Sequence, residues 1–149
     1  MNKSELLKNV SYNLLAEGKT IRIKAQGYSM YPAIKPGSVL LIEPLKVKGR
    51  PVAGEIVAII RKNGLIVHRI TSIIKIDGTD HYIARGDSNA RADDPVKPGL
   101  IAGRVVRAET SGLNQVLADI SKNEKPDYIL NRIRVVSIIL WKKLKRLFG

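Results

Sequence analysis

Cysteine is absent from this chain of 149 residues, histidine occurs only twice, and aromatic residues make up 5% of the sequence. Without cysteine there can be no disulfide framework, no cysteine-based zinc site and no cysteine nucleophile. Two histidines, His68 and His81, are too few for a histidine-rich metal site, so we expect no metal and no other cofactor. The scarcity of aromatic rings also leaves little surface for stacking on nucleic-acid bases.

Long apolar runs are missing as well. Residues 1–24 contain no continuous apolar segment of the kind that forms the centre of a secretory signal. The longest predominantly apolar run, Val135 to Trp141, is far shorter than the roughly 20 residues that a helix needs to cross a bilayer. We therefore expect no signal peptide and no transmembrane helix, and a location that is cytoplasmic or peripheral at a membrane.

Positive charge is in excess, since 26 lysine and arginine residues against 13 acidic residues give a formal net charge of +13. Such a charge predicts an anionic partner, either lipid head groups or nucleic acid. Many of the basic residues lie among apolar ones in the last third of the chain, which favours lipid. The segment Tyr128 to Phe148 is typical of a basic amphipathic helix that lies in the plane of an anionic membrane. Packing of this helix on the protein's own sheet or on a partner protein is the alternative.

The length and the 44% hydrophobic content are sufficient for one domain with a buried core. Ser4 to Glu17 is expected to be an amphipathic helix, because leucine and valine recur at helical spacing and Gly18 follows as a stop. After it, short apolar segments separated by glycine and proline signals predict strands with no helix between them. The expected strands are Thr20–Ala25, Ser38–Ile42, Glu55–Arg61, Leu65–Ile74, Ile101–Val106, and a hairpin of Ile73–Ile76 with His81–Ala84.

This pattern predicts a mainly β fold, a coiled antiparallel sheet with an N-terminal helix and a C-terminal amphipathic helix. Residues 1–108 form the expected domain, with the first helix inside residues 1–18. Residues 109–149 form a basic helical extension, in which Leu113–Ser121 is expected to add a short helix before the longer one.

The segment Gln26 to Pro44 places Ser29 on a stiff corner between two of these strands. Gly27 allows a backbone conformation closed to other residues, and Pro32 fixes its own φ and keeps the preceding residue extended. A hydroxyl on such a corner points in one direction. The alternative is an ordinary loop serine before a buried strand.

Two later stretches favour a chemical role for Ser29. His68 lies in an apolar strand segment, and the polar loop that follows the hairpin carries Asp87, Asp93 and Asp94. A hydroxyl, an imidazole and a carboxylate can act as a nucleophile, its base and the group that orients the base. Free histidine exchanges protons near neutral pH, which suits a general base. The alternatives are a hydrogen-bonded core histidine and a solvated acidic loop.

Three blocks together resemble the signal peptidase I superfamily, which also includes self-cleaving LexA-type repressors. The blocks are Gly-Tyr-Ser-Met-Tyr-Pro, His-Arg-Ile, and Gly-Asp-Ser-Asn with a second aspartate six residues after the first. Histidine in the second block points to the branch of the endoplasmic reticulum, archaea and some Gram-positive bacteria, where it replaces the lysine base of the common bacterial enzymes. The resemblance covers about Thr20 to Val106 and implies a catalytic domain in residues 1–108. Family members usually carry a membrane anchor just before the serine block, and this sequence shows no such segment.

The resemblance implies peptide bond hydrolysis through an acyl-enzyme, with Ser29 as the nucleophile and His68 as its base. It places the orienting carboxylate on Asp93. Asp94 remains an alternative to Asp93, and Asp87 is expected to shape the loop. The backbone N–H of the serine would bind the developing oxyanion.

Three further residues of the serine block match the family pattern: Gly27, Met30 and Pro32. Signal peptidases often carry at the position of Gly27 a serine that gives the oxyanion a second donor, so this donor is unassigned and the position is more like the LexA-type branch. Met30 and Pro32 are expected to brace the corner. A Ser-Lys mechanism is the weaker alternative, and its candidate bases are Lys35, Lys46, Lys48 and Lys62.

The sequence therefore predicts a serine endopeptidase that removes a leader, signal or propeptide. The resemblance implies a groove for an extended peptide, with small residues preferred beside the cut bond. Without an anchor, cleavage of a dedicated peptide fits better than general secretion. Two alternatives stay open: an inactive peptide- or membrane-binding module of the same fold, and a DNA-binding regulator related to LexA-type repressors. We expect no nucleic acid partner, since no helix-turn-helix pattern is present.

Overall fold

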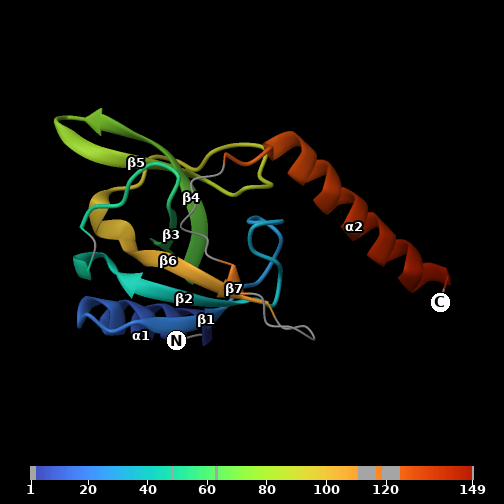
Figure 1. Cartoon of the computed structure of the whole chain (residues 1–149), viewed down its shortest axis with the longest axis horizontal. Helices are drawn as coiled ribbons and strands as arrows, with labels where there is room; N and C mark the ends of the chain where they lie inside the picture. Colours follow the sequence, from blue (N-terminus) through green and yellow to red (C-terminus); the bar gives the residue numbers. More distant parts are fainter. Residues whose placement is uncertain (1–2, 48, 63, 111–116, 119–124, 149) are drawn as a thin grey trace.

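A seven-stranded antiparallel β-sheet forms the centre of the molecule in a computed structural model of the chain (Figure 1). The structure describes residues 3–47, 49–62, 64–110, 117–118 and 125–148. Six strands follow the order β1-β2-β6-β3-β4-β5, and β7 pairs with β6. The strands are β1 (Ile21–Lys24), β2 (Val39–Pro44), β3 (Ile56–Arg61), β4 (Gly64–Ile76), β5 (Thr79–Arg85), β6 (Ile101–Glu109) and β7 (Leu117–Ala118).

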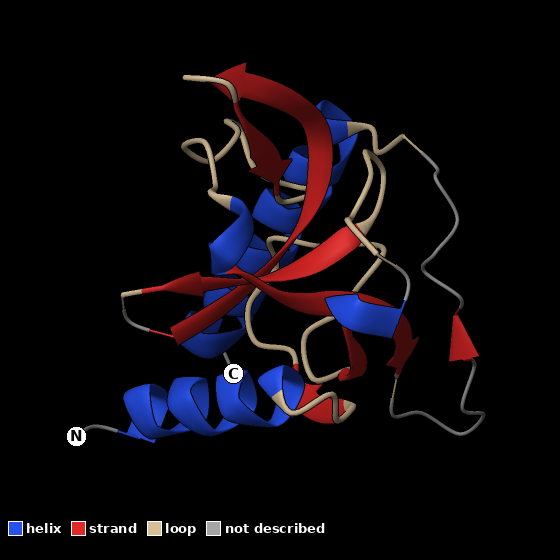
Figure 2. Ribbon diagram, turned by 90° about the vertical axis from the view of Figure 1, so that its left-hand side faces the viewer, coloured by secondary structure: helices blue, strands red, loops and turns tan. Residues whose placement is uncertain are grey.

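Two longer helices and two single turns of 3-10 helix complete the described structure. They are α1 (Lys3–Ala16), η1 (Leu45–Val47), η2 (Pro98–Leu100) and α2 (Tyr128–Phe148). The predicted mainly β, antiparallel fold with an N-terminal and a C-terminal helix is therefore confirmed. α1 packs along the sheet beside β1 (Figures 1 and 2). In contrast, α2 projects away from the body of the molecule (Figure 1).

β4 is longer than the sequence pattern indicated. The segments expected to end at Ile74 and to begin again at Ile73 form one strand of 13 residues. Its first half pairs with β3 and its second half with β5. Residues 71–76 are exposed, so this hairpin extends beyond the core (Figure 1). Asp77 and Gly78 form the turn of the hairpin, and both residues have positive φ, 48° and 74°.

The short helix expected over Leu113–Ser121 is wrong for Leu117 and Ala118, which form β7. β6 continues past the end of its pairing with β3, and β7 pairs there with Ala108 and Glu109. Unpaired backbone groups on a strand edge favour another strand, whereas an isolated short helix is only marginally stable. Residues 111–116 and 119–121 lie outside the described part of the chain.

β3 is buried on both faces, which accounts for its unbroken apolar sequence. Ile56 and Ala58 belong to one core cluster together with Leu15 of α1, whereas Val57 and Ile59 belong to a second cluster. Successive side chains of a strand alternate between faces, so one strand joins two cores. The first cluster includes residues between β1 and β2, and the second includes a residue of the loop after β5. Each core therefore anchors one of the loops on which the site was predicted.

Only the second half of α1 is packed into the core. Leu15 is 2% exposed, while Leu6, Leu7 and Val10 remain exposed. The helix is followed by Gly18, whose φ of 84° is typical of a glycine that ends a helix. The apolar spacing predicted the helix, but the apolar side chains of its first half stay at the surface.

The first turn of α2 is attached to the body of the molecule. The N–H of Leu130 donates to the carboxylate of Asp127 at 3.0 Å, which caps the helix. The guanidinium of Arg85 lies 3.7 Å from the ring centroid of Tyr128. Burial raises the pKa of Tyr128, and the negative charge of Asp87 raises it further. Within the described ranges, neither helix combines the length and the apolar content that crossing a membrane requires.

Candidate active site

Ser29 lies on a corner between β1 and β2 that is held by a glycine and by two buried side chains. Gly27 has a φ of 77°, in the region that favours glycine, as the sequence predicted. Met30 and Ile34 are buried in the first core cluster, and the N–H of Ile34 donates to the carbonyl of Met30 at 2.8 Å. Met30 thus braces the corner from the core, while Pro32 is exposed on its outer side. Ser29 itself remains partly exposed.

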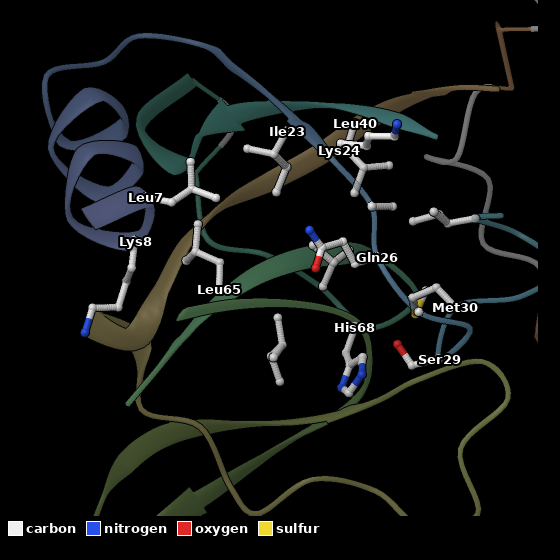
Figure 3. Close-up of a pocket in the computed structure, with 15 residues that line it drawn as sticks. Leu7, Lys8, Ile23, Lys24, Gln26, Ser29, Met30, Leu40, Leu65 and His68 are labelled. Carbon is white, nitrogen blue, oxygen red and sulfur yellow. The ribbon is translucent and has the colours of Figure 1, made fainter. Parts of the chain in front are cut away.

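A pocket of about 490 Å³ opens beside this corner (Figure 3). Ser29 and His68 lie at one end of the pocket, and Leu7 and Lys8 of α1 lie at the other end. The walls between them are mostly apolar and come from β1, β2 and the first residues of β4. Ser29 and His68 lie next to each other at their end of the pocket (Figure 3).

The imidazole of His68 is held by a carboxylate. Its Nδ1 lies 2.6 Å from Oδ2 of Asp93, which leaves Nε2 for another partner. His68 is only 7% exposed and lies opposite Val57 of β3, so a paired strand fixes its position. Among the contacts of the described residues, the hydroxyl of Ser29 has no hydrogen bond. Catalytic hydrogen bonds often form fully only when the substrate binds.

Asp93, and not Asp94, contacts the imidazole. The N–H of Asp93 donates to the carbonyl of Ala84 at 2.8 Å, which fixes the loop at this point. A guanidinium nitrogen of Arg61 lies 3.8 Å from the oxygen that faces His68. Asp94 is exposed to solvent. Of the two aspartates that the sequence left open, only Asp93 is therefore positioned to orient the ring.

Asp87 forms a buried ion pair with Arg69, the residue that follows His68. Nε and Nη2 of Arg69 donate to the two carboxylate oxygens at 2.9 and 2.7 Å, and Nη1 donates to the carbonyl of Gly54 at 2.9 Å. The two side chains are 7% and 1% exposed. Buried charges are stable only when they are paired and hydrogen-bonded, as they are here. The pair ties the start of the loop to β4, in agreement with a loop-shaping role for Asp87.

The loop after β5 also contacts the serine corner directly. The N–H of Ser88 donates to the carbonyl of Ser29 at 2.9 Å, and its hydroxyl donates to the carbonyl of Tyr28 at 2.6 Å. A Cβ on Gly86 would lie 2.7 Å from the carbonyl oxygen of Ser29. Only glycine allows such an approach without a shift of backbone. This loop, residues 86–97, is called the acidic loop below. It holds the imidazole of His68 through Asp93, and through Ser88 it holds the corner that carries the hydroxyl of Ser29.

α2 contacts both of these segments. Asn131, which is buried, donates from Nδ2 to the carbonyl of Asp87 at 3.0 Å. Nζ of Lys142 donates to the hydroxyl of Tyr28 and lies 5.3 Å from the centroid of its ring. Tyr28 is the residue before Ser29, so the helix is linked to the serine corner as well as to the acidic loop.

Of the lysines that were considered as alternative bases, the three that the structure describes make no contact with Ser29. Lys35 and Lys62 are exposed, and Nζ of Lys46 donates to a backbone carbonyl of α1 at 3.3 Å. Lys48 lies outside the described residues. The geometry therefore favours His68 as the base of Ser29.

Sequence reasoning missed four residues that hold the site together: Arg61, Arg69, Ser88 and Asn131. Arg69 carried the clearest signal, because a charged residue beside His68 in an apolar strand needs a buried partner. Asn131 carried a weaker one, as an uncharged polar residue in a helix of mostly apolar and basic residues. Arg61 and Ser88 carried none, since contacts between distant segments leave no local pattern.

Comparison of the chain with models of protein families and with curated proteins gave no match. In the part of the chain that the structure describes, no three histidine, aspartate or glutamate side chains are grouped so as to hold a metal ion.

Replacement of Asp87 by alanine leaves the buried guanidinium of Arg69 without its partner. We expect the free energy of unfolding to fall by about 3–5 kcal/mol in a urea titration followed by circular dichroism. Asp80→Ala is the control, because Asp80 pairs with Lys75 at the surface at 2.8 Å and such pairs contribute little. Equal losses in the two variants would contradict the role given to the buried pair.

Replacement of Gly86 by alanine forces a Cβ against the carbonyl oxygen of Ser29. We expect the free energy of unfolding to fall by about 1–3 kcal/mol, as in other overpacked sites. Gly99→Ala is the matched control, because a Cβ on Gly99 would meet nothing within 4 Å, and its effect should stay within about 0.5 kcal/mol. Equal stability of the two variants in thermal or urea unfolding would contradict the close approach of Gly86 to the carbonyl of Ser29.

Proposed function

We propose that the protein is a serine endopeptidase that cleaves a leader, signal or propeptide through an acyl-enzyme. The observation that carries this proposal is the 2.6 Å contact between Nδ1 of His68 and Asp93, with Ser29 beside His68 at the same end of the pocket. A buried imidazole held by a carboxylate can take the proton of a serine hydroxyl that faces it. The resemblance of the three motifs to the signal peptidase I superfamily supports the same function.

In this mechanism Oγ of Ser29 attacks the carbonyl carbon of the substrate while Nε2 of His68 takes the hydroxyl proton. Asp93 keeps the imidazole in one tautomer and stabilises the imidazolium that forms. The imidazolium gives the proton to the leaving amine, and an ester with Ser29 remains. The same imidazole then takes a proton from water, whose oxygen attacks the ester carbon. The imidazolium returns the proton to Oγ of Ser29 as the ester bond breaks, and the second product leaves as a carboxylic acid.

The negative charge on the substrate oxygen would be bound by backbone N–H groups of the corner. Within the described residues, the N–H groups of Ser29 and Met30 donate no hydrogen bond to the protein. Burial of Met30 and the contacts of Ser88 fix this stretch of backbone. Fixed donors stabilise a developing charge with little reorganisation. Because Gly27 has no side chain, we assign the oxyanion to main-chain donors.

The substrate is expected to bind as an extended strand. β1 is an edge strand of the described sheet and leads directly into the serine corner. A peptide that pairs with a free edge gains main-chain hydrogen bonds and is selected through its alternate side chains. The pocket beside Ser29 would accept an apolar side chain, and Leu7 and Lys8 limit the depth available to it.

The test of the proposal is covalent labelling of Ser29. The protein should gain the mass of one acyl group per chain when treated with acylating serine probes of several chemical types, as measured by intact-protein mass spectrometry. Ser29→Ala should remain unlabelled, while Ser72→Ala, which removes an exposed serine of β4, should label like the unchanged protein. Labelling that persists in Ser29→Ala, or none with any probe, would favour a peptide-binding module without catalysis.

The two adjacent aspartates give a second test. Asp93→Asn removes the charge that orients His68, so we expect the rate of labelling at Ser29 to fall by about 10²- to 10⁴-fold. Asp94→Asn changes the same charge one residue away, where the side chain is exposed, and should leave the rate almost unchanged. A loss in Asp94→Asn as large as that in Asp93→Asn would contradict the assignment of the orienting carboxylate.

A further inference from the structure

One side of α2 is apolar and uncovered. Six residues along the length of the helix form the middle of this side, and each is between 46% and 77% exposed: Ile129, Ile133, Val136, Leu140, Leu144 and Leu147. Successive residues of a helix are about 100° apart, so these six fall on one sector, which we call the apolar face of α2. Trp141 and Phe148, which are 62% and 87% exposed, lie along one edge of it.

The opposite side of α2 faces the body of the molecule. Asn131 is buried against the acidic loop, and Lys142 contacts Tyr28 of the serine corner. Ile129, Ile133 and Val136 at the start of the apolar face border a pocket that they share with Arg85 and the loop after β5. Beyond this pocket the helix projects outward, and Leu140, Leu144 and Leu147 are exposed (Figure 1). Packing of the apolar face on the protein's own sheet, which the sequence left open, therefore does not occur in the described structure.

Basic residues border the apolar face on both sides. Arg132 and Lys143 follow one border, and Arg134 and Lys145 follow the other. The helix carries no acidic residue. Long basic side chains can lay their stems along an apolar surface and extend their charges to a layer of phosphates. Two copies of the helix, face to face, would instead bring rows of like charge together.

We propose that the apolar face of α2 docks in the plane of an anionic lipid surface. The apolar side chains enter the boundary between head groups and acyl chains, and the bordering arginine and lysine residues bind lipid phosphates. Trp141 lies at the level where an indole ring is favourable, between the apolar and the polar layer. The docking does not depend on catalysis. Together with the proposed function, however, it implies a substrate held at a membrane surface, because Lys142 links the helix to the serine corner.

Trp141 provides a direct probe, since it is the single tryptophan of the chain. We expect its fluorescence to shift to the blue, and to be protected from an aqueous quencher, when the full chain is mixed with vesicles that contain phosphatidylglycerol. Vesicles of phosphatidylcholine alone should give a much smaller change. Binding measured by flotation should weaken at least tenfold between about 50 and 500 mM salt, because salt screens the charges.

Matched variants locate the contact. Leu140→Asp with Leu144→Asp should lower vesicle binding about a hundredfold, since both apolar groups are lost from the lipid contact. Val52→Asp with Ile73→Asp adds the same charge at exposed apolar positions elsewhere and should bind as the unchanged chain does. Ser29→Ala should also bind normally, so that failure of docking is distinguished from failure of the proposed catalysis.

Three results would overturn the docking proposal. The first is equal binding to charged and uncharged vesicles, or no binding to either. The second is equal loss in the two double variants. The third is a blue shift that depends on protein concentration without lipid and coincides with dimers in sedimentation, because a second copy would then cover the apolar face.

Discussion

The arrangement of the candidate site depends on the buried ion pair of Arg69 and Asp87. The guanidinium binds both carboxylate oxygens and, with its remaining nitrogen, the carbonyl of Gly54. Two buried charges are costly to separate, so the segments that carry them cannot move apart while the protein is folded. The pair joins the turn before β3, the middle of β4 and the acidic loop.

Two adjacent residues of β4 have different roles: Arg69 holds the structure of the site, and His68 is the proposed base. Arg69 binds the first aspartate of the acidic loop, and His68 contacts the second, Asp93. Between the two aspartates, Ser88 binds the backbone of the serine corner. The loop is thus fixed at three points, which hold the segments that carry the imidazole and the hydroxyl next to each other. In the proposed enzyme this rigidity is the preorganisation that catalysis requires.

Local patterns in the sequence were sufficient for the fold class and for most strands, because turn residues and apolar periodicity act over a few positions. They also identified Ser29 and His68 as residues of interest. They could not decide which of Asp93 and Asp94 contacts His68. That depends on the hydrogen bond from the N–H of Asp93 to the carbonyl of Ala84 in β5, which fixes the loop. For the same reason the sequence did not predict β7. Its partner is the last part of β6, Ala108 and Glu109, which lies beyond the residues of β6 that pair with β3. Contacts between distant segments decide such details, and they have no counterpart in a single sequence.

The burial of β3 on both faces has a consequence for how the sheet finds its alignment. A strand that is apolar on one face cannot slip by one residue, since the slip would expose its apolar side chains to water. β3 lacks this safeguard, because either face can enter a core. The alignment of β3 is fixed instead by Arg69 of the neighbouring strand β4, whose guanidinium donates to the carbonyl of Gly54, two residues before β3 begins. In a misaligned sheet this hydrogen bond would be lost. The side chain of Arg69 therefore favours one alignment of β3, a strand whose own apolar side chains would fit a core on either face.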